Sequence, residues 1–515
     1  FNACIKSSET KKNLKSSRPN VLLIVADDFS YESMSLVGGI APDVTPNIDK
    51  LAKEGLAFEN AFSTVAVCQP SRQSMLSGLI PLHYGSKGFF PMKEGVPTLP
   101  FLLGNSGYTT GIIHKIHHLQ PEKSFNWDFD NEKLGLTDPD GVVGRDPQAI
   151  ARGLKNLISF SSENNKPFFM MVGSADTHRP FHGDKINSNI PFWGNGIVDI
   201  NLKEPSRIYK PDEVNIPVAL PDIPAIRNDL AKYASSARRL DDTVGECLAV
   251  LREMNKENST LVIFVSDNGM PLPFGKFDAY YGSNRSPFLM RWPGVINKEQ
   301  SNNSHLISLM DITPTVLELA GLPIPSPMDG KSLVPFIENK EPENWRNSIV
   351  FIRNQDINYG DALEKVMKQR PEYADQLVSE GWIPRPDHEV PGTYSRDKEI
   401  RTYYDGKYGY IYNNCFNKNG LEIADLGVIV PYNGPSIKAI KIASKFDNSV
   451  KKRFEHLLLR APEELYDWSI DSGSNVNLVN NPEYAAVLKN ARKGLLKYME
   501  ASEDPLREVY EDLIK

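Results

Sequence analysis

The chain has 515 residues, of which 40% are hydrophobic and 24% charged, and its formal net charge is −7. A chain of this length exceeds a single compact core, so we expect a large domain with a smaller companion. No apolar run approaches the roughly 18 residues that a membrane span needs, and the negative charge gives no general affinity for nucleic acid. Composition therefore predicts a globular protein with no transmembrane segment and no nucleic-acid partner.

The cysteines and the first residues bear on the compartment. The four cysteines are widely spaced and match neither a disulfide framework nor a Cys/His zinc pattern. Residues 1–17 are polar and rich in Lys and Ser, and the small residue before Cys4 resembles the end of a bacterial lipoprotein signal. A lipid anchor at Cys4, a trimmed secretory leader and a disordered terminus remain open. The first two predict an extracytoplasmic protein that is periplasmic, attached to the cell surface or secreted.

Strands and helices alternate along much of the chain. Residues 20–28 form an apolar run that ends in two carboxylates, which is typical of a strand buried on both faces. Residues 45–55 predict a helix with Thr45 as its cap, Pro46 in its first turn and Gly55 at its end. Further strands are predicted at 108–114, 167–178 and 259–269, and further helices at 149–160 and 225–254. The alternation predicts an α/β fold with a large, mostly parallel sheet sandwiched by helices.

The sequence changes character after about residue 370. Residues 399–414 predict a hairpin that turns at Asp405 and Gly406, and residues 482–501 predict an amphipathic helix. We expect a smaller C-terminal α+β subdomain there. The predicted division is a leader remnant or tether at 1–17, the main domain at 18–370 and the C-terminal subdomain at 371–515.

Polar side chains directly follow three of the predicted strands. They are Asp27 and Asp28, His178, and Asp267 with Asn268. Ligands of an open α/β sheet bind beyond the carboxyl ends of its strands, so we expect these groups at one edge. Three carboxylates and an amide are oxygen ligands, which suit Ca²⁺ or Mg²⁺ and suit zinc poorly. Taken singly, the Asp pair and the Asn-Gly pair are also typical of turns or caps, and the histidine of a structural hydrogen bond.

A lone cysteine, Cys68, precedes Pro70, Ser71 and Arg72 at the start of a predicted helix. By itself such a cysteine is typical of a small hydrophobic residue in a core. A thiolate nucleophile would need a nearby cation, and Arg72 follows one helical turn later. A thiolate is a poor partner for oxygen ligands around Ca²⁺, so we expect a different chemical species at position 68.

These residues resemble a known family. Residues 68–78 are similar to the Cys-x-Pro-Ser-Arg signature of type I sulfatases, in which the cysteine is oxidised to Cα-formylglycine. The second signature of that family is visible at 107–118, although His114 stands where the family usually has glycine. The similarity continues at 18–28, 45–62, 261–269 and 464–484, and the segments 223–248 and 260–281 most resemble the sulfamidase (heparan N-sulfatase) group and its bacterial relatives. The resemblance implies an alkaline-phosphatase-like fold.

The resemblance also implies a role for each candidate residue. The hydrated aldehyde at Cys68 would be the nucleophile, held by Arg72, and it would expel sulfate by re-forming the aldehyde. His178 would protonate the leaving group, and His117 would help to break down the sulfated hydrate. The implied Ca²⁺ ligands are Asp27, Asp28, Cys68, Asp267 and Asn268. The implied sulfate contacts are Lys115, His117, His178 and Lys276. Without the family, both lysines would be typical of solvated surface charges.

The implied function is that of a Ca²⁺- and formylglycine-dependent sulfatase that acts on the end of a sulfated carbohydrate, with N-sulfoglucosamine narrowly ahead of any one O-sulfated sugar. Its partners would be the glycan and a sulfatase-maturating enzyme. Two alternatives remain: a phosphodiesterase or phosphonate hydrolase of the alkaline phosphatase superfamily, and a sulfated-glycan-binding protein in which Cys68 stays unmodified. Sugar contacts are expected from residues 180–205 and 355–396, where Trp193, Trp382 and Arg385 could stack on or bind a ring, or could pack within the fold.

Overall fold

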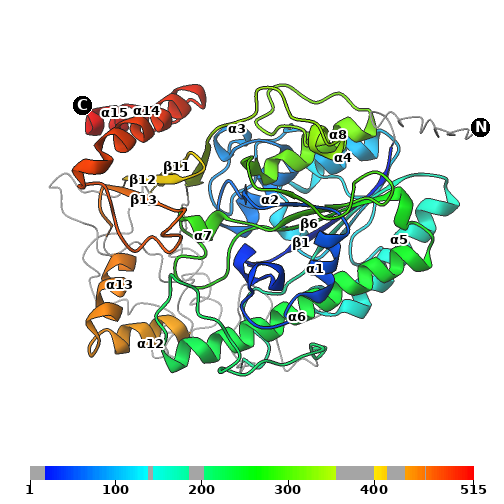
Figure 1. Ribbon diagram of the computed structural model, residues 1–515. Helices are drawn as coiled ribbons and strands as arrows, with labels where there is room; N and C mark the ends of the chain where they lie inside the picture. The colour runs from blue at the N-terminus through cyan, green and yellow to red at the C-terminus, as the bar shows by residue number, and fades with distance from the viewer. Residues whose placement is uncertain (1–17, 137–142, 185–201, 355–398, 415–434, 459) are drawn as a thin grey trace, which may run out of the picture.

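The computed structural model describes residues 18–136, 143–184, 202–354, 399–414, 435–458 and 460–515. Figure 1 shows a central sheet flanked by helices, with a smaller sheet and the last helices to one side. The predicted leader at 1–17 and the predicted boundary near residue 370 lie outside the described residues.

The central sheet has seven strands in the order β4-β5-β1-β6-β7-β2-β8. They are β4 (Thr109–Ile113), β5 (Phe168–Gly173), β1 (Asn20–Ala26), β6 (Thr260–Ser266), β7 (Phe288–Arg291), β2 (Leu56–Phe58) and β8 (Gln300–Asn302). The strands β4, β5, β1 and β6 are mutually parallel, β7 runs antiparallel to β6, and β2 runs antiparallel to β7. The predicted α/β sheet is therefore confirmed as a mixed sheet whose parallel part contains the four strands predicted from sequence.

Helices cover both faces of this sheet, because alternate side chains of each strand point to opposite faces. Leu22 and Ile24 of β1 pack in the core shared with α1 (Pro46–Lys53), α5 (Pro147–Glu163) and α6 (Pro224–Glu253). Val21 and Leu23 pack in the core shared with α2 (Cys68–Ser77), α4 (Leu99–Asn105) and α8 (Ile312–Ala320). The central strands are thus buried on both faces, as their unbroken apolar runs predict.

The smaller sheet is antiparallel, with the order β10-β11-β12-β13. Its strands are β10 (Ile349–Arg353), β11 (Glu399–Tyr404), β12 (Tyr408–Asn414) and β13 (Glu463–Asp467). The predicted hairpin turns at Gly406, which has a φ of 94° that suits glycine. Four helices accompany this sheet, α12 (Pro435–Ala443), α13 (Asn448–Leu458), α14 (Ala485–Ala501) and α15 (Arg507–Ile514). The predicted amphipathic helix is α14.

The remaining strands and α-helices among the described residues are short. They are the strand pair β3 (Ala61–Phe62) and β9 (Ile307–Ser308), and the helices α3 (Pro81–Tyr84), α7 (Tyr281–Asn284) and α9 (Val334–Ile337). Among the described residues, no helix combines the length and the apolar character that crossing a membrane requires.

The smaller sheet packs directly against segments of the main domain that flank the candidate site. The amide of Ile352 in β10 donates to the carbonyl of Thr64 (2.8 Å), four residues before Cys68. The hydroxyl of Thr402 in β11 donates to the carbonyl of Ala279 (2.8 Å), three residues after Lys276. The C-terminal sheet therefore holds the segment before Cys68 and the segment after Lys276 through hydrogen bonds to their backbones.

Candidate active site

The strand ends singled out from sequence meet at one edge of the sheet, because β1 lies between β5 and β6. Asp27 and Asp28 directly follow β1, and Asp267 and Asn268 directly follow β6. The amide of Asp28 donates to Oδ1 of Asp267 (3.1 Å), and the side-chain amide of Asn268 donates to Oδ1 of Asp28 (2.8 Å). All four side chains are buried.

Helix α2 brings Cys68 to these carboxylates, since Cys68 is its first residue. Sγ of Cys68 and oxygen atoms of Asp27 and Asp267 all lie within 4.8 Å of one another. The helix is anchored there by Ser71, whose hydroxyl donates to the backbone carbonyl of Asp267 (2.6 Å). The predicted cysteine and the predicted carboxylates thus belong to one cluster.

Three cations lie among the three carboxylates. Nε and Nη2 of Arg72 contact Oδ2 of Asp267 at 2.9 and 2.8 Å. Nζ of Lys115 lies 2.5 Å from Oδ2 of Asp27. Nζ of Lys276 lies 2.5 Å from Oδ1 of Asp28 and 3.1 Å from Sγ of Cys68. The formal charges of the six groups cancel when all of them are ionised.

Burial sets the protonation of the central groups. Burial raises the pKa of Cys68 to about 12, with the neighbouring Lys276 opposing the shift, so the side chain is a thiol at neutral pH. Burial also raises the pKa of Asp267 to about 7, against the pull of Arg72. Burial opposes ionisation of Asp27 too, but the positive charges of Lys115 and Arg72 hold its pKa well below the ordinary value.

Two predicted histidines lie beside this cluster. Nδ1 of His178 lies 2.5 Å from the backbone carbonyl of Arg179, so Nδ1 carries the hydrogen, and Nε2 lies 3.9 Å from Oδ2 of Asp28. Burial lowers the pKa of His178 to about 4, and burial followed by the charge of Lys115 lowers the pKa of His117 to about 4. Both imidazoles are therefore neutral near pH 7 in the protein alone.

The backbone at His114 explains why glycine is usual there. His114 and Lys115 have φ values of 61° and 58°, in the left-handed region that glycine adopts most readily. The His114 ring fits because Gly144 faces it, since a Cβ on Gly144 would lie 2.8 Å from the ring. The departure from the family pattern leaves Lys115 in contact with Asp27.

Sequence reasoning missed a buried ion cluster that supports the loop of His178. Nη2 of Arg145 donates to the carbonyl of His178 (3.0 Å), and its Nε lies 3.7 Å from Asp176. Nε and Nη2 of Arg239 in α6 donate to the two carboxylate oxygens of Asp176 at 2.7 and 2.9 Å. These residues are far apart in sequence and form no motif, so only the fold brings them together.

The donor set fits an oxygen-preferring cation. Within the part of the chain that the structure describes, Oδ1 of Asp27, Oδ2 of Asp28 and Oδ1 of Asn268 are buried and accept no hydrogen bond. Buried oxygens of this kind normally have a partner, and carboxylate and amide oxygens are what Ca²⁺ prefers. Nη1 of Arg72 is likewise a buried donor with no acceptor among the described residues, which suits a bound anion.

The predicted sugar contacts cannot be placed. Trp193, Trp382 and Arg385 lie outside the described residues, as do the segments 185–201 and 355–398.

Known proteins resemble this chain over most of its length. Human N-sulphoglucosamine sulphohydrolase is 29% identical over 509 residues, which cover 94% of this chain and 91% of that protein. An ulvan-active sulfatase of Formosa agariphila is 27% identical over 505 residues, which cover 97% of this chain and 83% of that protein.

Among solved structures, the phosphonate monoester hydrolase of Agrobacterium radiobacter has a TM-score of 0.62 at 18% identity and covers 94% of this chain and 96% of its own. At that identity the likeness concerns the fold alone, which is alkaline-phosphatase-like as predicted. The sulfatase family model matches residues 19–322, more than half of the chain. The matched segment includes every candidate residue of the site, and the chain belongs to the sulfatase family of sulfuric ester hydrolases.

Proposed function

We propose that the protein is a formylglycine- and Ca²⁺-dependent sulfatase that removes sulfate from the end of a sulfated carbohydrate. The observation that carries the proposal is the position of Cys68. Its sulfur lies 3.1 Å from Nζ of Lys276 and within 4.8 Å of carboxylate oxygens of Asp27 and Asp267. Carboxylates around an oxygen-preferring cation suit an oxygen ligand better than a thiol, so these surroundings favour an oxygen at this position. Conversion of Cys68 to formylglycine would supply that nucleophilic oxygen.

The metal proposal rests on the oxygen donors. Asp27, Asp28, Asp267 and Asn268 would hold the ion, with the modified side chain at position 68 beside it. When bound, Ca²⁺ would add two positive charges to a site whose own charges cancel, and would stabilise charge on the sulfate group. Such an excess of positive charge favours an anionic substrate.

The chain's own cations are held where they could meet a sulfate. Asp267 orients Arg72, Asp27 orients Lys115 and Asp28 orients Lys276, so these donors need little reorganisation when an anion binds. We assign Arg72 to the group at position 68, and Lys115 and Lys276 to the sulfate oxygens.

The two histidines would handle protons. Because Nδ1–H of His178 is engaged by a carbonyl, Nε2 is the atom that could exchange a proton with the leaving oxygen or nitrogen. His178 must first gain a proton at Nε2 to act as an acid, and a nearby anionic ester would favour that charge. His117 would assist the later step, in which sulfate is released from the side chain at position 68.

The proposed compartment and partner follow from the sequence. The proposed setting is extracytoplasmic, as a periplasmic, secreted or cell-surface protein, the last with a lipid on Cys4. A sulfatase-maturating enzyme would act on Cys68.

Two measurements test the proposal. Mass spectrometry of the Cys68 peptide from the native host should find an aldehyde in place of the thiol. Sulfate-ester hydrolysis should then exceed phosphodiester and phosphonate hydrolysis by the same preparation. Preferential phosphonate or phosphodiester turnover would favour the first alternative, whereas an unmodified thiol with retained glycan affinity and no turnover would favour a glycan-binding protein.

A further inference from the structure

The segment of residues 274–280, which carries Lys276, lies between the active site and the C-terminal subdomain. The amide of Phe277 donates to the carbonyl of Ala66 (2.9 Å), two residues before Cys68. On the other side, the hydroxyl of Thr402 donates to the carbonyl of Ala279 (2.8 Å). The position of Lys276 therefore depends on contacts that reach outside the main domain.

The strongest of these contacts is a buried ion pair. Nη2 of Arg460 lies 2.5 Å from Oδ2 of Asp278, and both side chains are only 2% exposed. The other carboxylate oxygen of Asp278 accepts the amide of Ala279 (3.0 Å), so the carboxylate is fixed to the backbone of the segment. The Arg460 guanidinium also lies 4.5 Å from the ring centre of Tyr280.

Further contacts hold both ends of the segment. The hydroxyl of Tyr280 donates to the buried Oε2 of Glu464 in β13 (2.8 Å), which also accepts the hydroxyl of Tyr466 (2.5 Å). At the other end, the Arg453 guanidinium of α13 lies 3.6 Å from the ring centre of Phe274. Residues before and after Lys276 are thus held by the same part of the subdomain.

We propose that Arg460 is a positioning residue for Lys276. Lys276 has a long flexible side chain, and the distance of its Nζ from Cys68 and Asp28 depends on where the backbone of the segment lies. Arg460 fixes that backbone through Asp278, two residues after Lys276, with a planar group that pairs with a carboxylate and stacks on an aromatic ring at once. The C-terminal subdomain therefore completes the active site without contacting the substrate through Arg460. This inference rests on the proposed function of Lys276.

The test compares Arg460→Met with the charge-retaining Arg460→Lys. We expect kcat for a sulfated sugar to fall roughly 10- to 100-fold in Arg460→Met while KM changes less than about threefold, since small displacements of a catalytic group cost up to about 10²-fold. Arg460→Lys should recover part of the loss. In a Lys276→Met background, Arg460→Met should have no further effect on kcat, because Arg460 acts through Lys276.

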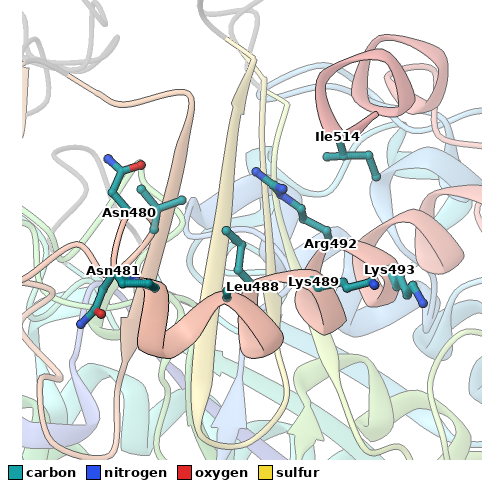
Figure 2. A pocket seen from close by; sticks show the side chains of 10 residues that line it. Asn480, Asn481, Leu488, Lys489, Arg492, Lys493 and Ile514 are labelled. Atoms are coloured by element: carbon teal, nitrogen blue, oxygen red, sulfur yellow. The ribbon is translucent and has the colours of Figure 1, made fainter.

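A second ion pair of the same subdomain, which is more exposed, provides a control. Arg492 in α14 pairs with Glu463 of β13 through contacts of 2.7 and 2.5 Å. It also lines the pocket that Figure 2 shows, together with Lys489 and Lys493. Arg492→Met also removes an ion pair of the subdomain, but the Arg492 side chain contacts no residue of the 274–280 segment. We expect its kcat to stay within about twofold of wild type.

Crystal structures give a readout that does not depend on turnover. In Arg460→Met, or in Asp278→Asn if that variant folds poorly, Nζ of Lys276 should move away from the atom at position 68, from which it lies 3.1 Å in the wild type. An unmoved Lys276, equal losses in Arg460→Met and Arg492→Met, or additive losses in the Lys276→Met background would overturn the inference. A wild-type protein that hydrolyses no sulfate ester would instead overturn the proposed function, and the crystallographic comparison would still decide the role of Arg460.

Discussion

The ammonium group of Lys276 lies 3.1 Å from the sulfur of Cys68. This lysine is also paired with Asp28, and it stays protonated because that carboxylate, against the effect of burial, raises its pKa well above the ordinary value. Besides its pairing with Asp28, this cation can stabilise negative charge at position 68, and an uncharged thiol carries none. The arrangement is better explained if the side chain at position 68 becomes an oxygen-bearing group that is charged or strongly polar during the reaction.

Replacing Cys68 with alanine should abolish sulfate release and leave the fold intact, because alanine fits a small buried site but offers no nucleophile. The check is steady-state turnover alongside thermal unfolding. Cys247→Ala is a matched control, since Cys247 is a buried cysteine of α6 in the core shared with α1 and α5. It should lose little activity. Hydrolysis by Cys68→Ala near the wild-type rate would refute the role of this residue.

Removing divalent cations should lower activity, and Ca²⁺ should restore it better than Zn²⁺, because Asp27, Asp28, Asp267 and Asn268 offer only oxygen atoms. Asp267→Ala should imitate the stripped protein, since it removes a ligand and also the partner of Arg72. Activity assays with elemental analysis provide the measurement. A stoichiometric zinc ion in fully active protein would count against the assignment.

The first helix shows how far sequence could go. Its existence and its Pro46 were predicted correctly, and Thr45 does occupy the cap position, but the Thr45 hydroxyl donates to Asp49 and makes no bond to the helix backbone. The backbone amides of Asn47 and Ile48 donate instead to Asp241 of α6 (2.9 and 2.8 Å). Local spacing predicts where a helix starts, but a cap from another helix depends on tertiary packing.

The same distinction holds at the active site. Groups at strand ends and in the two signatures were predictable because a parallel sheet gathers its strand ends and because the signatures are local. Asp176, Arg239 and Arg460 had no such signal, since each pairs with a residue from a different part of the fold. Sequence therefore indicated the groups expected to meet the substrate and missed those that orient them.

Asp241→Ala should destabilise the protein by about 1–3 kcal/mol, because it leaves buried backbone donors of α1 without an acceptor. Asp241→Asn should cost less, since it keeps an acceptor oxygen and since burial already raises the pKa of Asp241 to about 7. Denaturant unfolding measures both variants. Equal losses of unfolding free energy in the two variants would show that the acceptor oxygen does not account for the stabilisation by Asp241.

The pair of His83 and Asp329 should make stability depend on pH. Nδ1 of His83 lies 2.8 Å from Oδ2 of Asp329, and this hydrogen bond raises the pKa of His83 above its ordinary 6.5. A group whose folded pKa is raised stabilises fully below the unfolded pKa and loses that contribution as pH rises through the folded pKa. The melting temperature of the wild type should therefore exceed that of His83→Asn by more at about pH 6 than at about pH 9. A constant difference across this range would contradict the expected protonation.

The burial of the reacting groups favours action at the end of a glycan chain. Cys68 and Lys276 are only 3% and 2% exposed, so the reacting sulfate must reach below the protein surface, which the end of a glycan chain does more easily than its middle. We therefore expect removal of terminal sulfate groups, measured as sulfate release from defined mono- and oligosaccharides. Matched oligosaccharides that carry the sulfate at the end or inside the chain provide the control. Cleavage of internal sulfates alone would refute the exo prediction.

N-sulfoglucosamine should be the best single substrate, although only narrowly. The three fixed cations recognise a sulfate group that N- and O-sulfated sugars share, so they cannot separate the two classes. The ranking comes from similarity to N-sulphoglucosamine sulphohydrolase over 94% of this chain. Release of sulfate from O-sulfated sugars with inert N-sulfoglucosamine would reverse the ranking and leave the proposed sulfatase chemistry standing, because both reactions use the same anion site.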